Sequence, residues 1–345
     1  MNIHKLLFRL TIYLISFLLI GGCTLSQNSI YTQESQSFVN NTPFRFGFSN
    51  WPAYMRWQVA DEEEIFESNK VNVDLKFYDY IDSIKQLAEG KSDANCQSLN
   101  DTISTIALGK TPDQAIVLIT DISLGGDQVI VREGINKITD LKGKKIATEV
   151  GSVDHFLLLL GLKKAGLAPN DVKILNLNMR EAVASFLEGE IDGVSVFIPF
   201  TQESLNLPGS KVLFSSKDFP GYIIDHVSVT RKMIKENPEV VQAIVNSWFD
   251  TLKFIDKNPD KSYKQMAEQS GVTVKQFQDN ESLLNIFDYQ ENRRFFQSGF
   301  EGKKPSEISE EINQFLLSNK IIEKKGNLQN LFDDQFIQAY LKSHQ

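Results

Sequence analysis

The stretch DLKGKKIATEVGSVDHFLLLL, residues 140–160, decides the fold. It predicts a lysine-rich turn, a buried strand over Ile146–Val150, a sharp corner at Gly151-Ser152 and a helix that begins at Val153. The first N–H groups of a helix have no partner within the helix, so a strand that leads through a polar corner into a helix often forms a ligand site in α/β folds. The corner is therefore predicted to be half of a binding site.

The N-terminal 22 residues are set apart from the rest of the chain. Lys5 and Arg9 are followed by an apolar run, Leu10–Ile20, which is short for a membrane-spanning helix and is followed at once by Gly21-Gly22-Cys23. Small residues before a cysteine are typical of a bacterial lipoprotein signal, so we expect cleavage before Cys23 and a lipid anchor on its sulfur. An ordinary N-terminal anchor helix is the alternative.

Composition limits the function of the remaining chain. Loss of Lys5 and Arg9 with the signal changes the net charge from −8 to −10, and an acidic protein of this kind is a poor candidate for binding nucleic acid. Cys96 is the one cysteine left with a free side chain and is expected to be a buried hydrophobe. His155 and His226 have no partner at a metal-ligand spacing. We therefore expect no metal and no cofactor.

Strand and helix patterns alternate along the chain after a polar tether, residues 23–42. This alternation predicts parallel sheets covered by helices, hence an α/β class. One lobe is expected from residues 43–131 plus 218–345 and the other from 132–217, with the cleft between them and a helical C-terminal extension. Ala94–Gln97 is interpreted as a short connection, and the chain after Thr230 as almost wholly helical. Strands are expected over Phe44–Phe48, Val71–Phe77, Ala115–Ile122, Gln128–Val131, Ile146–Val150, Val172–Asn176, Gly193–Phe197 and Asp225–Thr230.

The loops expected at the carboxyl ends of these strands are strongly acidic. They contain no Arg or Lys, and their acidic residues are Asp101, Asp121, Asp127, Glu149, Asp154 and Asp225. A sulfonate or nitrate would meet uncompensated carboxylates, each costing about 4 kcal/mol at 4 Å under an effective dielectric constant near 20. A guanidinium ion can instead pair with carboxylates through two parallel hydrogen bonds and stack on Trp51, with Phe197 and Phe200 on the other side. The loops therefore favour a small cation.

Local roles compete with ligand binding at several of these positions. Ser98 and Asp101 have the spacing of a capping box, and Ser152 and Asp154 can serve the N-terminus of their own helix. Glu149 has no evident local use, so its substitution by Gln is expected to weaken a cationic ligand strongly. The candidate ligand-binding residues are Asn50, Trp51, Ser98, Asn100, Asp101, Asp121, Glu149, Ser152, Asp154, Phe197 and Asp225.

Four strings in order resemble a known family. Asp140–Ala147 (DLKGKKIA), Gly151-Ser152, Gly189–Gly193 (GEIDG) and Asn237–Glu239 (NPE), after a lipoprotein signal, resemble the periplasmic solute-binding proteins of ABC importers for nitrate, taurine and alkanesulfonates. The resemblance covers most of the chain up to about residue 259. It implies a type II periplasmic-binding fold with the ligand in the interlobe cleft, and a permease and an ATPase as partners. It also implies an exported, lipid-anchored protein, expected to be a monomer.

Some members of this family look to be carriers of guanidine or urea-like compounds, which agrees with the acidic loops. The expected function is therefore capture of a small nitrogen compound, with guanidinium or another small cation first. The alternatives are a sulfonate, nitrate or a thiamine-type pyrimidine, or the sensor subunit of a receptor. The pyrimidine-synthase branch uses a cysteine-rich motif and histidines. The chain after the signal has only Cys23, Cys96, His155, His226 and His344, so no catalytic residue is expected.

Overall fold

The computed structural model describes residues 42–109 and 111–343. The expected signal, the anchor residue Cys23 and almost all of the expected tether lie outside these ranges. Within them, no helix combines the length and the apolar character that crossing a membrane requires.

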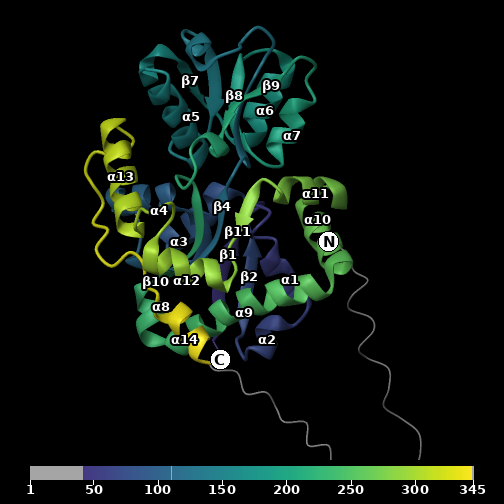
Figure 1. Cartoon of the computed structure of the whole chain (residues 1–345), viewed down its shortest axis with the longest axis vertical. Coiled ribbons are helices and arrows are strands. Elements are labelled where there is room, and N and C mark those ends of the chain that lie inside the picture. Colours follow the sequence, from purple (N-terminus) through teal and green to yellow (C-terminus); the bar gives the residue numbers. More distant parts are fainter. Residues whose placement is uncertain (1–41, 110, 344–345) are drawn as a thin grey trace, which may run out of the picture. The chain divides into compact units, whose positions relative to one another are not determined.

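The first lobe is built on a mixed six-stranded sheet (Figure 1). β1 pairs in parallel with β2 and β3, whereas β10 runs antiparallel to both β3 and β4. β3, β4 and β10 are buried along their whole length, as expected of central strands covered on both faces. In sheet order the strands are β11 (Leu284–Ile286), β4 (Gln114–Ser123), β10 (Ile224–Thr230), β3 (Ala94–Ser98), β1 (Phe44–Phe48) and β2 (Val73–Phe77).

Helices from both ends of the chain cover this sheet. Trp57 of α1 and Trp248 of α9 are fully buried against each other, with ring centroids 5.1 Å apart, and form the centre of the core. The helices are α1 (Arg56–Glu62), α2 (Ile65–Ser68), α3 (Tyr80–Ala88), α4 (Leu99–Leu108), α8 (Arg231–Glu236), α9 (Pro238–Lys257), α10 (Pro259–Ser270), α11 (Val274–Glu281), α12 (Tyr289–Ser298), α13 (Pro305–Ser318) and α14 (Gln335–Ser343).

The second lobe has a five-stranded sheet of its own (Figure 1). β6 pairs in parallel with β7 and β8, and β5 runs antiparallel to β8 and β9. In sheet order the strands are β7 (Lys173–Asn176), β6 (Lys145–Thr148), β8 (Gly193–Phe197), β5 (Asp127–Val131) and β9 (Lys211–Ser215). The helices are α5 (Val153–Lys164), α6 (Met179–Glu188) and α7 (Phe200–Leu205), and short 3-10 turns span Ile138–Leu141, Pro169–Asp171 and Ser216–Asp218. The predicted two-lobed α/β class is thus confirmed.

Two segments carry the chain between the lobes. The first crossing, residues 124–126, follows β4, and the second crossing, residues 216–223, precedes β10. The Ser216 hydroxyl joins them: it accepts a hydrogen bond from the Gly125 N–H at 2.7 Å and lies 2.7 Å from the Ser123 hydroxyl. The two crossings therefore form one connected hinge.

Three elements differ from the sequence-based expectation. β5 lies in the second sheet, so the first crossing precedes Asp127 and the expected lobe boundary at 131 is late. Residues Ala94–Ser98 form the buried strand β3, where a connection was expected. Asn95 and Gln97 obscured this strand because their amides are buried and hydrogen-bonded to each other, so the apolar pattern of a central strand is missing. The short strand β11 interrupts the C-terminal helices.

Candidate functional site

Strand register brings three predicted site residues together at one edge of the first sheet. Asp225, near the start of β10, lies opposite Ser98 at the end of β3 and opposite Asp121 near the end of β4. Because β10 is antiparallel to both neighbours, its first residues meet their last ones. The second lobe supplies Asp127 at the start of β5 and Phe197 at the end of β8, which are opposite each other in register.

A small inner cavity lies where these residues meet. Its volume of about 10 Å³ is enough for roughly one water molecule, so a larger solute enters only if the walls move apart. None of the described residues that line it is Lys or Arg. The lining residues are Trp51, Tyr54, Tyr80, Ser98, Asp127, Val153, Phe197 and Asp225.

Asp225 and Asp121, both in the first lobe, accept hydrogen bonds from neighbouring side chains. Asp225 Oδ1 accepts from the Ser98 hydroxyl at 2.5 Å and from the Tyr54 hydroxyl at 2.9 Å. Asp121 accepts from the Trp51 indole N–H at 3.0 Å through one oxygen, and from the Thr120 hydroxyl at 3.0 Å through the other. Each carboxyl group is thereby held in one orientation.

Asp101, in the first turn of α4, is held in the same way. Its Oδ2 accepts from the Tyr80 hydroxyl at 2.5 Å and its Oδ1 from the Asn100 amide at 2.9 Å. Ser98 is the N-cap residue of α4, but its side chain makes no capping hydrogen bond and points to Asp225 instead. The capping-box interpretation of Ser98 and Asp101 is therefore wrong, and both side chains contribute to the site.

The carboxylates of the second lobe, Asp127 and Asp154, have fewer hydrogen-bond partners. Asp154, in the first turn of α5, is fully buried, and neither of its carboxyl oxygens has a hydrogen-bond partner in the described structure. Asp127 Oδ2 and the Ser152 hydroxyl are also buried without a partner there. Since burying an unpaired polar group costs about 1–3 kcal/mol or more, these acceptors require a ligand, a proton or water. The side chains of Ser152 and Asp154 are not used as helix caps.

Burial raises the pKa of every carboxyl group in this cluster. The pKa of Asp101 rises to about 8, that of Asp127 to about 7 and that of Asp225 to about 6, with desolvation as the main cause and neighbouring carboxylates as a further one for Asp101 and Asp127. The pKa values of Asp121 and Asp154 are raised well above the usual range for the same reasons. Near neutral pH the cluster therefore holds protons that a cation can replace.

Aromatic rings close the inner cavity on several sides. Phe197 of the second lobe meets Trp51 and Tyr80 of the first edge-to-face, with ring centroids 6.0 Å and 5.9 Å apart. Trp51 also packs on the first crossing, since a Cβ added at Gly126 would lie 2.7 Å from its ring. These rings offer the faces on which an organic cation can stack.

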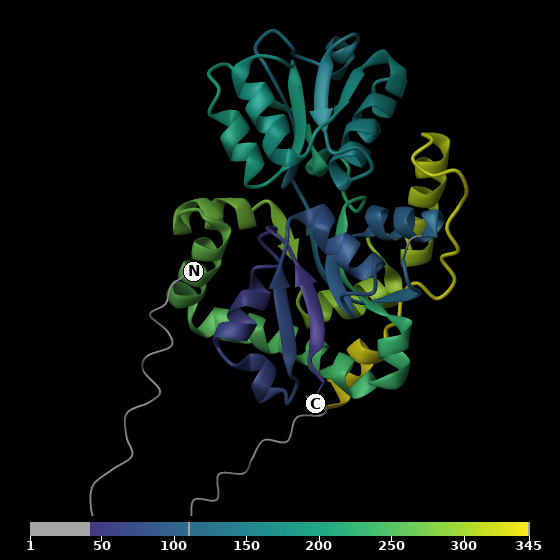
Figure 2. The same ribbon diagram turned by 180° about the vertical axis from the view of Figure 1, so that it is seen from behind.

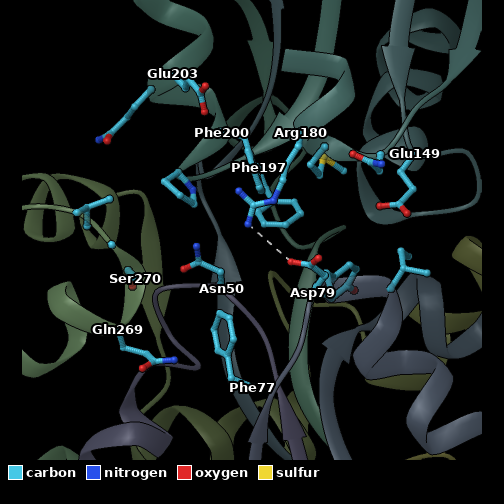
Figure 3. Close-up of a pocket in the computed structure, with 18 of the residues that line it drawn as sticks. Asn50, Phe77, Asp79, Glu149, Arg180, Phe197, Phe200, Glu203, Gln269 and Ser270 are labelled. Atoms are coloured by element: carbon cyan, nitrogen blue, oxygen red, sulfur yellow. Dashed lines mark ion pairs between the residues drawn. The ribbon is translucent and has the colours of Figure 1, made fainter. Parts of the chain in front are cut away.

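A wider cavity of about 1060 Å³, the outer cavity, is lined by residues of both lobes (Figure 3). Asp79 of the first lobe and Arg180 of the second form an exposed ion pair across it, at 3.9 Å. Tyr80 and Phe197 line both cavities and so separate them. Glu149 lies in this outer cavity, where burial raises its pKa against the opposing effect of Lys85.

Most of the candidate residues lie in or around the inner cavity, and two of them lie in the outer cavity. Trp51, Ser98, Phe197 and Asp225 line the inner cavity. Buried around it are Asn100, Asp101, Asp121, Ser152 and Asp154. Asn50 and Glu149 belong to the outer cavity instead. Glu149 therefore lies apart from the inner cavity and its aspartates.

Sequence reasoning missed four residues that line the inner cavity, one of them Val153, the first residue of α5. Tyr80 follows the carboxyl end of β2, and that position was the available signal. Tyr54 lies in a turn before α1, where its neighbours Ala53 and Met55 are buried apolar residues. Asp127 was counted among the acidic loops but was left out of the candidate ligand residues. In the described part of the chain, no group of three or more His, Cys, Asp or Glu side chains is placed to hold a metal ion.

Comparisons with known proteins relate this chain to solute-binding proteins. The profile of the family described as NMT1/THI5 like matches residues 51–262. The taurine-binding periplasmic protein of Escherichia coli (strain K12) is 30% identical over 226 residues, which cover 62% of this chain and 69% of that protein.

Solved structures share the fold at low sequence identity. The alkanesulfonate-binding protein SsuA from Xanthomonas axonopodis pv. citri, bound to MOPS, superposes with a TM-score of 0.69 at 17% identity, covering 85% of this chain and 98% of that one. The desulfurization enzyme DSZB superposes with a TM-score of 0.61 at 14% identity, covering 87% and 99%. The predicted type II periplasmic-binding fold is confirmed, and both a binding protein and an enzyme share it.

Proposed function

Because the chain belongs to the NMT1/THI5-like family, we propose that it is the solute-binding component of an ABC importer and that its solute is a small organic cation, with guanidinium first. The predicted relationship to binding proteins for taurine and alkanesulfonates is confirmed. The names of these relatives support the sulfonate alternative better than guanidinium. The side chains of the site itself support the cation.

One observation carries the cation proposal. Five buried aspartates surround a cavity that no described Lys or Arg lines. Arg56 is the positive charge that acts on Asp121, but its guanidinium donates to the Pro52 carbonyl oxygen and pairs with Glu281. A bound cation would supply the missing positive charge, and its N–H groups would donate to the partnerless oxygens of Asp127 and Asp154.

A sulfonate remains the second candidate because the relatives favour it. The physical route to it is protonation: a neutral carboxyl group can donate a hydrogen bond to an anion, and the raised pKa values keep several of these groups protonated near pH 7. The two candidates therefore depend on pH in opposite directions. A cation competes with the protons of the cluster, whereas a sulfonate needs them.

Calorimetry on the full chain tests the proposal. Guanidinium chloride, methylamine, urea, taurine, nitrate and a thiamine-type pyrimidine are titrated separately, at concentrations far below those that denature. Guanidinium is expected to bind most tightly, and Asp127→Asn is expected to weaken it roughly 30-fold or more, as for removal of one partner of a buried charge pair. Asp79→Asn, at the exposed rim, is the matched control. Tight binding of taurine with no heat from guanidinium contradicts the cation proposal.

The proposal includes no chemistry performed by the protein. Cys96 is a free cysteine, but burial raises the pKa of its thiol and the Trp57 indole N–H lies 3.2 Å from its sulfur. A thiol in this setting stays protonated and unreactive. Incubation with the best-binding solute should therefore return that solute unchanged, as followed by mass spectrometry.

The same proposal assigns the protein to the outer side of the cytoplasmic membrane. Export agrees with the periplasmic binding proteins among its relatives, and the sequence pattern before Cys23 supports a lipid anchor there. The anchored monomer would deliver its solute to a permease and an ATPase. Mass spectrometry of the membrane-extracted protein should find a diacylglyceryl group on Cys23, and Cys23→Ser should lose both this group and membrane attachment.

A further inference from the structure

The C-terminal part of the chain packs on both crossings of the hinge. We call five of its residues, Leu283, Phe300, Lys303, Glu311 and Phe315, the C-terminal clasp. At the first crossing, the Leu124 N–H donates to the Leu283 carbonyl oxygen at 2.8 Å. A Cβ added at Gly125 would lie 3.3 Å from the Leu283 side chain, so this crossing runs directly over the clasp.

The second crossing is held more extensively. The ring of Phe300 covers Gly221 so closely that an added Cβ would lie 2.5 Å from it. The next residue, Tyr222, donates a hydrogen bond from its hydroxyl to Glu311 Oε2 at 3.1 Å. Lys303 pairs with Glu311 at 2.6 Å, and its ammonium group lies 5.6 Å from the centre of the Tyr222 ring. Two consecutive hinge residues are thus fixed by side chains of the clasp.

The clasp also reaches the second lobe directly. α13 packs on α4 of the first lobe and runs up beside α5, as both views show (Figures 1 and 2). Its Phe315 meets the buried ring of Phe156 edge-to-face, with ring centroids 5.2 Å apart, and Lys163 of α5 lies 5.2 Å from the centre of the Phe315 ring. Phe156 follows Asp154 by two residues, so α13 contacts the helix that carries the partnerless carboxylate.

We propose that the C-terminal clasp holds the lobes in the closed arrangement and so sets the balance between open and closed cleft. Rotation of the second lobe about the hinge must change the torsions of residues 219–222 and move α5 past α13. Both movements disturb the contacts of Gly221, Tyr222 and Phe156 with the clasp. A loss of these contacts lowers the closed population and with it the apparent affinity for any solute. Phe315 and Tyr222 are therefore positioning residues that touch no ligand.

Trp51 provides a readout that needs no solute and does not depend on the identity of the ligand. It is 5% exposed and lies against Phe197 of the opposite lobe, so its indole becomes accessible when the cleft opens. Trp57 and Trp248 are fully buried in the first-lobe core and give a constant background. Quenching of tryptophan fluorescence by acrylamide in the full chain therefore measures opening, and Trp51→Phe identifies the signal that reports it.

Phe315→Ala is the main variant and Phe296→Ala its matched control. Phe296 is also a C-terminal phenylalanine, but it is only partly buried and packs on Phe295 and Phe332 within the first lobe. Phe315→Ala should raise the quenching constant of Trp51 severalfold, with Phe296→Ala close to the parent. Tyr222→Phe, which removes one hydroxyl and leaves the fold intact, should raise it less.

Three results overturn the proposal, two of them in the Phe315→Ala protein. One is a Phe315→Ala protein that melts earlier but shields Trp51 as well as the parent does, because the contact then supports stability alone. The other is equal quenching in the Phe315→Ala and Phe296→Ala proteins. A parent protein whose Trp51 is already fully accessible without solute counts against the proposal in the same way, since the clasp would then not hold the cleft closed.

Discussion

The carboxylates of the two lobes face the same site but differ in their hydrogen bonding. Asp101, Asp121 and Asp225 of the first lobe each accept hydrogen bonds from hydroxyl, indole or amide groups. In the second lobe, both oxygens of Asp154 and one of Asp127 are buried without a partner in the described structure. The first lobe is therefore organised in advance, whereas the second lobe has acceptors that only a ligand, a proton or water can satisfy.

This difference suggests an order of events on binding. A solute that settles on the first lobe meets fixed carboxylates and aromatic faces, at little cost in side-chain ordering. Closure then brings Asp127 and Asp154 to those N–H groups of the solute that do not donate to the first lobe. Because the second set of contacts forms only in the closed cleft, it supplies the free energy that favours closure.

The largest expected effect is a difference in stability between the Asp225→Ala and Asp154→Ala proteins. Asp225→Ala leaves the Ser98 and Tyr54 hydroxyls buried without their acceptor, so the free energy of unfolding should fall by about 2 kcal/mol or more. Asp154→Ala removes a carboxylate that has no partner, so the melting temperature should stay unchanged or rise. Both variants should lose roughly 100-fold in guanidinium affinity. Thermal unfolding and calorimetry measure the two effects.

An equal loss of stability in both variants would contradict the proposed difference between the carboxylates of the two lobes. Asp82→Ala, an exposed carboxylate of the outer cavity that pairs with Lys85, is the control for removing negative charge alone. The free energy of unfolding of this variant should stay within about 0.5 kcal/mol of the parent's, as for most surface substitutions.

The next effect is a fall in stability as pH rises. A carboxyl group whose folded pKa is raised contributes stability below its unfolded pKa, near 4, and loses it as pH rises through the folded pKa. For Asp225, Asp127 and Asp101 that window runs from about 4 to about 6, 7 and 8. The protein without solute should therefore unfold at lower denaturant concentration at pH 8.5 than at pH 5.

Asp154→Ala sharpens this test, since the pKa of the Asp154 carboxyl group is itself raised well above its usual range, by desolvation first and then by the charges of Asp127 and Asp101. Its removal should flatten the pH dependence between pH 5 and 8.5. Equal slopes of stability against pH in parent and variant would mean that repulsion between like charges does not destabilise the cluster.

Trp51→Phe should have a smaller effect, on affinity alone. The substitution keeps an aromatic face but removes the indole N–H that holds Asp121, which then keeps only the Thr120 hydroxyl. A weaker cation–π contact and one lost hydrogen bond predict about a tenfold loss in guanidinium affinity. Taurine binding, if present, should change less, because an anion gains nothing from the ring face.

The smallest effect is expected for Glu149→Gln. Although the sequence suggested a central role, this side chain lies in the outer cavity, where solvent and Lys85 moderate its charge. Guanidinium affinity measured by calorimetry should change by less than about threefold. A loss as large as that of Asp154→Ala would show that the outer cavity holds the solute.

The sequence was sufficient for the lobes and for the acidic character of the site. Alternation of strands and helices identified the class, and the rule that ligands meet the carboxyl ends of strands located Trp51, Ser98 and Phe197. How deeply each of these residues is buried could not be predicted from the sequence. Glu149 and Asp154 are five residues apart around one corner, and only the turn of the backbone at Gly151 decides which of them is buried.

Strand β3 and the roles of Tyr54 and Tyr80 could not be predicted from the sequence either. The Asn95 amide donates a hydrogen bond to the Gln97 amide oxygen inside the sheet, so a buried strand had a polar sequence. Tyr54, in the turn before α1, and Tyr80, the first residue of α3, donate hydrogen bonds from their hydroxyls to Asp225 and Asp101. These partners are distant in sequence, and the apolar residues around the tyrosines give no sign of them. Partnerships of this kind depend on register between strands, which single-sequence patterns do not specify.

The most direct test of the cation site is the sign of the pH dependence of binding. Dissociation constants for guanidinium and for taurine are measured by calorimetry at pH 5.5, 7 and 8.5. Because a cation displaces protons from carboxyl groups with raised pKa values, guanidinium affinity should rise with pH across this range, with protons released on binding. An affinity for taurine that rises as the pH falls, together with no pH-dependent binding of guanidinium, would contradict the account.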